Sequence, residues 1–318
     1  MRILGLAHYL PSTVITNADL QSRMEVDQEF LETKIGISER RVAGPDESST
    51  DMACQAVARL LQLHSVPQAS IGLLVVCTQS PDYLLPTTAC LVQHRSGLPT
   101  SCLAFDVNLG CSGYVYCLTL ISACLRAGMA RHALLVTVDQ YSKLIDPRDK
   151  HTASIFGDAA SCTWLGDSNA PGGLIDWDLG TDGSGALSLI AHNSGVVRDS
   201  AKSTFLQMNG REIFKFSIEA VPQCVNRLLA RNQLGVDQVN LFVFHQANRY
   251  MLREIQKRMG ISDEQMLIDL QHTGNTVSSS IPIALERRLA SQPLPAGSRI
   301  VLCGFGVGLS WGSVLYTV

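Results

Sequence analysis

The 318-residue sequence lacks several features that would place it in common classes of protein. It contains no run of about 20 apolar residues, which argues against a transmembrane helix. Its formal net charge is only −3, which gives no general affinity for nucleic acids or anionic membranes. Residues 1–7 form a strand-like run without the apolar core and cleavage site of a signal peptide. We therefore expect a cytoplasmic protein that binds neither nucleic acid nor membrane.

The ten cysteines include no Cys-x-x-Cys pair. This spacing argues against a zinc site and against a disulfide framework, so we expect reduced thiols and no metal. Charged residues make up 17% of the chain and hydrophobic residues 46%, as in a compact globular protein. A chain of this length can bury a large core and divide into two domains.

One cysteine lies in a stretch around which the rest of the chain is organised. Residues 101–107 are apolar and short, as in a buried strand, whereas residues 114–127 are long enough for about three or four helical turns. Gly110-Cys111-Ser112-Gly113 therefore predicts a tight strand-to-helix turn. A thiol at a helix N-terminus is expected to have a pKa below the free value of about 8.5. We favour Cys111 as a nucleophile; the alternative is one more small buried residue.

Helical and strand-like segments alternate along the chain, which predicts an α/β fold with buried sheets. The main expected strands are residues 71–77, 133–138, 159–165, 299–303 and 313–318, and the main expected helices are 50–63, 87–94, 248–259 and 278–289. The strand at 71–77 has a counterpart 168 residues later, at 239–245, after a similar helix and turn. This long period indicates a duplicated domain. The turn-rich residues 167–173 are the best linker candidate between two halves, 1–168 and 169–318.

Two polar residues in the second half are weaker candidates on their own. His245 ends an apolar strand, and Asn275 lies between a glycine and threonines. A lone histidine at a strand end is more often structural, and an asparagine beside glycine is usually a turn former. Both become catalytic candidates only if the fold brings them to Cys111. The glycine-rich loop at 304–308 leads into a strand instead of a helix, which disfavours a phosphate-binding loop.

Several motifs resemble one known family in their order and spacing. They are residues 35–41, Asn108-Leu-Gly-Cys111-Ser-Gly113, Phe156-Gly-Asp158, Asp182-Gly-Ser, His245-Gln-Ala-Asn248, His272-Thr-Gly-Asn275-Thr and residues 304–312. Over nearly its whole length the chain resembles β-ketoacyl-acyl-carrier-protein synthase III of the thiolase superfamily. Plant-type polyketide synthases share the Cys/His/Asn set, but Gly-Asn-Thr after His-Gln-Ala-Asn favours synthase III. The resemblance implies a duplicated thiolase-like five-layer αβαβα sandwich and a homodimer.

The resemblance also implies a reaction in fatty acid biosynthesis or in a specialised branch of lipid metabolism. Cys111 would carry a short acyl group as a thioester, while malonyl-acyl carrier protein lost carbon dioxide beside His245 and Asn275. The enolate would attack the acyl group in a Claisen condensation that gives a 3-oxoacyl product. The backbone N–H groups of Cys111 and Gly306 would form the oxyanion hole. The alternatives are acyl transfer to an alcohol or amine without condensation, and an inactive partner subunit; the intact Cys/His/Asn set argues against the latter.

Thioesters of coenzyme A and of acyl carrier protein are the implied substrates, and no cofactor is implied. Phe30 and Lys150 stand where the family clamps the coenzyme A adenine with an aromatic residue and an arginine. Lys34 stands where an arginine of the family contacts a phosphate of coenzyme A. Asn248 belongs to the same binding site. Phenylalanine and lysine stack less well than tryptophan and arginine, which predicts modest use of acyl-coenzyme A. Leu85 stands where many bacterial members place a phenylalanine that closes the acyl pocket.

A group of basic residues coincides with the family's docking surface for acidic acyl carrier protein. The group comprises Lys215, Arg249, Arg253, Lys257 and Arg258. The alternative is an ordinary solvated helix face. In the helix at 248–259, Tyr250, Met251, Ile255 and Met259 are expected to face inward.

Overall fold

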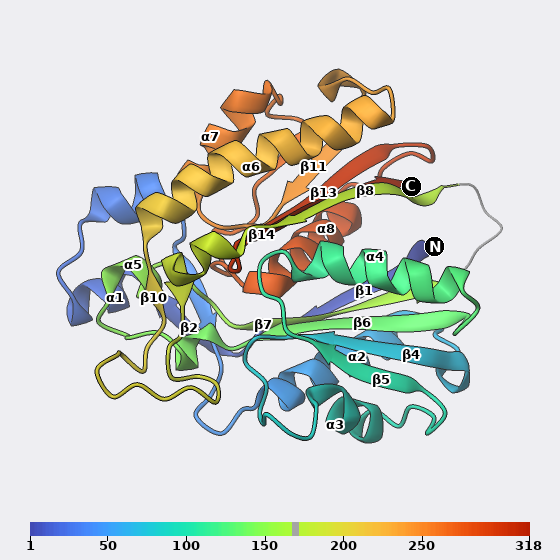
Figure 1. Ribbon diagram of the computed structural model, residues 1–318, viewed down its shortest axis with the longest axis horizontal. Helices are drawn as coiled ribbons and strands as arrows, with labels where there is room; N and C mark the ends of the chain where they lie inside the picture. Colours follow the sequence, from blue (N-terminus) through green and yellow to red (C-terminus); the bar gives the residue numbers. More distant parts are fainter. Residues whose placement is uncertain (167–171) are drawn as a thin grey trace.

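Two mixed sheets form the frame of the protein in the computed structural model, which describes residues 1–166 and 172–318 (Figure 1). The first sheet has the order β1 (Arg2–Tyr9), β7 (Ala159–Gly166), β6 (His132–Asp139), β4 (Ile71–Cys77) and β5 (Leu103–Val107). The second has the order β12 (Met266–Leu267), β11 (Leu241–Phe244), β13 (Arg299–Gly306), β14 (Ser310–Thr317) and β8 (Gly173–Thr181). The predicted boundary at 168/169 and residues 167–171 of the predicted linker lie outside the described residues.

The two sheets have the same topology. In the first sheet, β4 pairs in parallel with β5 and β6, and β7 and β1 follow β6 in antiparallel pairs. In the second, β11 pairs in parallel with β12 and β13, and β14 and β8 follow in antiparallel pairs. Strands β4 and β11 are the ones that the sequence repeat aligns, so the topology agrees with the predicted duplication.

Helices make up the other three layers (Figure 1). The helices α4 (Gly113–Arg126) and α8 (Ser280–Ser291) lie between the two sheets. The helices α2 (Ser49–Leu63) and α3 (Thr88–Arg95) cover the outer face of the first sheet, and α6 (Gly210–Arg231) and α7 (Arg249–Met259) lie over the second. The predicted five-layer sandwich is confirmed. Because α4 is apolar around most of its circumference, it is stable only when enclosed on several sides.

The remaining elements are short and lie mainly near one end of the sandwich. The ribbons β2 (Thr13–Thr16)–β3 (Glu39–Val42) and β9 (Leu189–Ile190)–β10 (Gln207–Met208) are separate from the main sheets. Short helices and turns are α1 (Asn17–Arg23), α5 (Lys150–Ala153), η1 (Phe30–Ile35), η2 (Gln68–Ser70), η3 (Tyr141–Lys143), η4 (Gly183–Ser188), η5 (Val236–Gln238) and η6 (Val277–Ser279). In the described parts of the chain, no helix is both long and apolar enough to span a membrane.

Most predicted elements are present, with two corrections in the second half. The strand at 71–77 has the predicted bounds, and the helix predicted at 114–127 is α4. Strand β13 continues to Gly306 instead of ending at Cys303, so only residues 307–309 form the turn to β14. Tyr250 was expected to face inward but is exposed, because it stacks on Phe214 of the neighbouring helix α6 at the surface.

Candidate active site

The structure brings the three predicted catalytic residues into one cavity. Cys111 comes from the turn between β5 and α4, His245 follows β11 directly, and Asn275 precedes η6. All three line a cavity of about 590 Å³. Cys111 belongs to the first half of the chain and the other two residues to the second, so local sequence pattern could not link them and only the family resemblance did.

The environment of Cys111 differs from the prediction made for a thiol at a helix N-terminus. Burial, and secondarily the charge of the Asp139 carboxylate, raises the pKa of the Cys111 thiol to about 12. The backbone N–H groups of Val307 and of Cys111 itself lower it, but less. The predicted lowering of this pKa is wrong, because lost hydration of the thiolate outweighs the favourable dipoles. The thiol therefore needs a base to take its proton.

The end of β13 lies directly against the sulfur. A Cβ at Gly306 would lie 2.8 Å from Cys111 Cβ and 3.0 Å from its Sγ, so this approach requires glycine. The backbone N–H group that is hydrogen-bonded to the sulfur belongs to the next residue, Val307. The two backbone donors at Cys111 are thus its own N–H and that of Val307, one residue beyond the predicted Gly306.

His245 is oriented by Ser280 of α8. Its Nδ1 lies 2.8 Å from Ser280 Oγ, and the same oxygen lies 2.9 Å from the Val277 carbonyl oxygen. When the hydroxyl proton is donated to that carbonyl, Nδ1 carries the ring proton and Nε2 is unprotonated and can accept a hydrogen bond. Burial lowers the pKa of His245 to about 3, so the imidazole is neutral.

Asn275 is oriented by bonds from both of its ends. Its Nδ2 lies 3.3 Å from His245 Nε2 and donates to it, while its Oδ1 accepts the N–H of Val277 at 2.9 Å. Its backbone N–H donates to Ile155 O at 2.9 Å. Gly274, with φ of +73°, allows this approach, since a Cβ there would lie 2.9 Å from Ile155 O. Main-chain bonds between the halves therefore fix Asn275 beside His245.

Two residues that contact His245 were not predicted. Ser280 is the last of three consecutive serines, and nothing in its local pattern distinguishes it from the other two. Phe305 lies in the glycine motif at residues 304–312, and its ring packs edge-on against the His245 ring, with centroids 5.6 Å apart and an angle of 86°. An apolar residue facing a histidine has no signature in the sequence.

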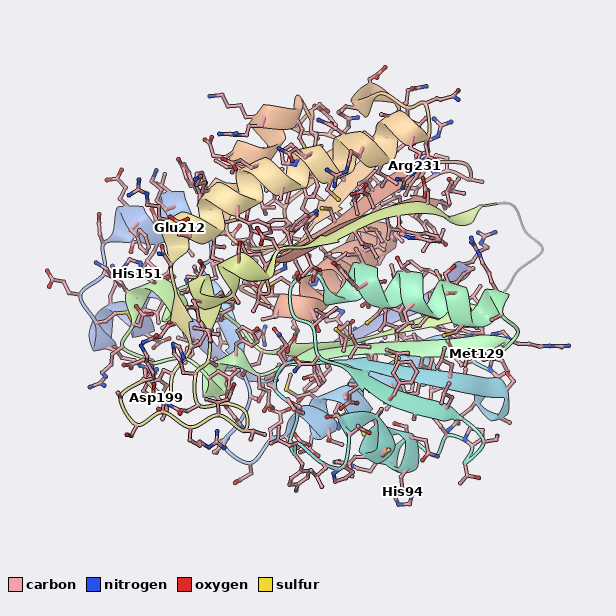
Figure 2. The ribbon with its side chains drawn as sticks, viewed as in Figure 1. His94, Met129, His151, Asp199, Glu212 and Arg231 are labelled. Atoms are coloured by element: carbon pink, nitrogen blue, oxygen red, sulfur yellow. The ribbon has the colours of Figure 1, made fainter. Side chains whose placement is uncertain are left out.

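The residues predicted for the thioester donor are only partly at the cavity. Phe30 and Asn248 line it. Lys150 is exposed and is not among the lining residues, whereas the next residue, His151, lines the cavity and meets the Phe30 ring edge-on at 6.3 Å. Figure 2 shows His151 at the same end of the molecule as Glu212, near the start of α6. Lys34 Nζ lies 4.1 Å from the centroid of the Tyr250 ring.

Leu85 and the basic residues lie on the surface. Leu85 is 83% exposed and does not line the cavity of its own chain. Lys257 and Arg258 are exposed on α7, where Arg253 forms an ion pair with Asp263 at 2.5 Å.

The remaining two basic residues have other surroundings. Arg249 is half-buried, with Nη2 3.4 Å from Gly36 O. Lys215 lines a different groove, together with Glu212 and Glu219 of α6. The predicted docking surface is thus best represented by the exposed residues of α7.

Two topologically equivalent sheets around buried helices, with Cys, His and Asn in one cavity, define a thiolase-like condensing enzyme. The family model for 3-oxoacyl-[acyl-carrier-protein (ACP)] synthase III matches residues 105–183, and the model for its C-terminal part matches residues 229–318. The chain is 35% identical to β-ketoacyl-[acyl-carrier-protein] synthase III of Shigella dysenteriae and 32% identical to that of Natranaerobius thermophilus, in each case over 99% of this chain and 98% of that protein.

Solved structures give the same result. A crystal structure of a 3-oxoacyl-(acyl-carrier-protein) synthase III has a TM-score of 0.94 at 40% identity, covering 100% of this chain and 99% of that one. The synthase III of Thermus thermophilus has a TM-score of 0.93 at 35% identity, with the same coverage. The priming β-ketosynthase of the R1128 polyketide pathway has a TM-score of 0.92 at 30% identity, covering 100% of this chain and 96% of that one. The chain belongs to the β-ketoacyl-acyl-carrier-protein synthase III family.

Proposed function

We propose that this cavity performs the decarboxylative condensation of an acyl group on Cys111 with malonyl-acyl carrier protein. The observation that carries the proposal is the meeting of Cys111, neutral His245 and oriented Asn275 in one cavity. Sulfur supplies an exchangeable thioester, and uncharged groups stabilise an enolate without protonating its carbon.

The first half-reaction is acylation of Cys111. His245 Nε2 is unprotonated in the tautomer described above and takes the thiol proton as the sulfur attacks, because burial disfavours a free thiolate–imidazolium pair. The sulfur attacks the carbonyl carbon of the donor thioester, and the backbone N–H groups of Cys111 and Val307 stabilise the resulting oxyanion. The C–S bond of the donor then breaks, and the leaving thiolate takes the proton from His245.

The second half-reaction is decarboxylation and carbon–carbon bond formation. Asn275 Nδ2 is a fixed, neutral donor for the malonyl thioester oxygen. His245 donates to the same oxygen when its proton is on Nε2, and Ser280 supports this tautomer too, because a hydroxyl can donate to Nδ1 as well as accept from it. Loss of carbon dioxide leaves an enolate whose carbon attacks the acyl carbonyl. The Cys111–acyl bond breaks, and the thiolate takes a proton from solvent.

The proposed partner is acyl carrier protein, docked on the exposed basic residues of α7. Lys257 and Arg258 provide positive charge there for an acidic protein. Coenzyme A is proposed as the donor carrier at Phe30, His151 and Asn248, which line the cavity. No resident cofactor is required by this scheme. A homodimer and a cytoplasmic location stay predictions.

The test follows the two half-reactions separately. The protein is incubated with a panel of acyl-coenzyme A thioesters, and intact-protein mass spectrometry records the adduct on Cys111. Malonyl-acyl carrier protein is then added, and carbon dioxide release is measured. We expect no adduct in Cys111→Ala, and in Asn275→Ala an adduct without carbon dioxide release. Discharge of the adduct to an alcohol or amine, without malonyl consumption, would instead support simple acyl transfer.

A further inference from the structure

A buried carboxylate beneath the active site has no role in the reaction steps above. Asp139, the last residue of β6, is 0% exposed. Among the described residues, the titratable groups that interact with it are Asp158, Cys111, Cys77 and Tyr141, which come from four different segments around it. None of these groups is a cation, so the charge of Asp139 is not neutralised by an ion pair with any of them.

Asp139 connects the two halves of the chain at the catalytic loop. One carboxylate oxygen accepts the backbone N–H of Gln79, which follows β4, at 2.9 Å. The other accepts the backbone N–H of Ser278 at 3.2 Å and its hydroxyl at 2.5 Å. Ser278 adjoins Val277, whose N–H donates to Asn275 Oδ1. The carboxylate thus anchors the segment that orients the Asn275 amide.

The same carboxylate lies close to the nucleophile and acts on it through its charge. Gln79, which donates to Asp139, packs its side-chain oxygen against Gly110, directly before Cys111: a Cβ at Gly110 would clash with Gln79 Oε1. After burial, the charge of Asp139 is the largest cause that raises the pKa of Cys111. Burial also raises the pKa of Asp139 itself to about 7, although three hydrogen bonds oppose that rise. The charge on Asp139 consequently changes across neutral pH.

We propose that Asp139 is a positioning residue that affects the two half-reactions in opposite directions. Its hydrogen bonds to Ser278 hold Asn275 in place for malonyl decarboxylation, while its negative charge restrains ionisation of Cys111 and slows acylation. This inference rests on the proposed function of Cys111 and Asn275. A residue with only a structural role would favour both half-reactions or neither.

Two variants separate the hydrogen bonds from the charge. Asp139→Asn removes the charge and places an amide donor against one of the backbone N–H groups. Ser278→Ala removes one hydrogen bond and keeps the charge. The readouts are the rate of Cys111 alkylation by iodoacetamide, measured on the Cys111 peptide by mass spectrometry, and carbon dioxide release from malonyl-acyl carrier protein.

The two variants are expected to differ at about pH 8.5, where Asp139 is ionised. In Asp139→Asn, alkylation of Cys111 becomes about tenfold faster, as a decrease of about one pKa unit predicts. Carbon dioxide release becomes about tenfold slower, as loss of a hydrogen bond to a charged acceptor predicts. In Ser278→Ala, carbon dioxide release slows while alkylation stays at the wild-type rate.

The matched control is Asp158→Asn. Asp158 is equally buried and also accepts bonds from one hydroxyl and two backbone N–H groups, those of Ser142 and Ala43, but it does not contact Ser278. This variant is expected to leave the alkylation rate of Cys111 unchanged. It also shows what the removal of any buried carboxylate does to stability.

The wild-type pH profile gives an independent readout if Asp139→Asn does not fold. Because Asp139 gains charge across neutrality, the alkylation rate of Cys111 should rise by less than tenfold per pH unit between about pH 6 and pH 8. The hydrogen bond with Cys117 and burial keep Cys77 neutral in this range, and burial keeps Tyr141 neutral. Because the charge of Asp158 raises the pKa of Asp139, Asp158→Asn should move the curvature to lower pH without abolishing it, which assigns the curvature to Asp139.

Two results would overturn the inference: alkylation of Cys111 that does not accelerate in folded Asp139→Asn, or a uniform tenfold slope in the wild-type profile. Unchanged carbon dioxide release in Ser278→Ala would also overturn it, provided that the wild type decarboxylates. A wild type that does not release carbon dioxide refutes the proposed function instead, and the alkylation experiments remain decisive for the charge effect.

Discussion

The hydroxyl of Ser280 orients His245, and its removal tests the proposed chemistry directly. In Ser280→Ala, His245 Nδ1 loses its hydrogen-bond partner at 2.8 Å, in a site where His245 is only 2% exposed. An unsatisfied buried donor or acceptor costs about 1–3 kcal/mol. Because about 1.4 kcal/mol corresponds to a tenfold change in rate, we expect malonyl decarboxylation to slow by about 10- to 100-fold.

The assay combines rapid-quench measurement of carbon dioxide release from pre-acylated enzyme with thermal unfolding. Ser279→Ala is the matched control, because Ser279 is equally buried but its hydroxyl lies 2.8 Å from Thr137 Oγ1 and has no bond to His245. We expect both variants to lose stability and only Ser280→Ala to lose decarboxylation. Wild-type carbon dioxide release in Ser280→Ala, or equal losses in both variants, would refute the assigned role of this hydroxyl.

Three further predictions test the donor site, the docking surface and the buried carboxylate. Phe30→Ala should raise the Michaelis constant for acyl-coenzyme A about tenfold, while Lys150→Ala, outside the cavity, should leave it unchanged in the same steady-state assay. Neutralising Lys257 and Arg258 together should raise the Michaelis constant for malonyl-acyl carrier protein, and more at low salt than at about 0.5 M, where exposed charges are screened; an effect independent of salt would contradict docking there. Burial raises the pKa of Asp139 from 3.8 to about 7, so the folded protein binds this proton more tightly than the unfolded chain does. The contribution of protonated Asp139 to the free energy of unfolding is therefore lost as the pH rises between those two values. The melting temperature of Asp139→Asn, relative to wild type, should therefore improve from about pH 5 to pH 8 in calorimetry.

Segments with strong hydrophobic patterns were predicted well because they are buried on several sides. The strand at 71–77 is apolar throughout, since helices cover both faces of its sheet, and a repeat of that strand at 239–245 revealed the duplication. Cys111 was predictable from its turn, because small residues between a strand and a helix are a local feature. His245 and Asn275 were not predictable from local pattern alone, and only the resemblance linked them to Cys111.

Side-chain direction on short elements could not be predicted in the same way. Helix α5 has only four residues, and successive residues on a helix point about 100° apart. Alignment by motif selected Lys150, whereas the side chain at the cavity is that of His151. Tyr250 fits an inward position by its spacing, but it stacks on Phe214 and has Lys34 over its ring. Such contacts depend on helices that are distant in sequence.

The pKa of Cys111 shows why the local motif gave the wrong sign. The motif supplies the helix N-terminus and one backbone N–H group, both of which favour the thiolate. The opposing causes are the burial of Cys111 and the charge of Asp139, which follows 28 residues later at the end of another strand. Burying a charge without a nearby cation costs more than one helix N-terminus offsets. The net effect therefore disfavours the Cys111 thiolate and raises the pKa of the thiol. The thiol therefore loses its proton only as the sulfur attacks, and the tautomer in which Ser280 accepts from Nδ1 leaves His245 Nε2 unprotonated and able to take that proton.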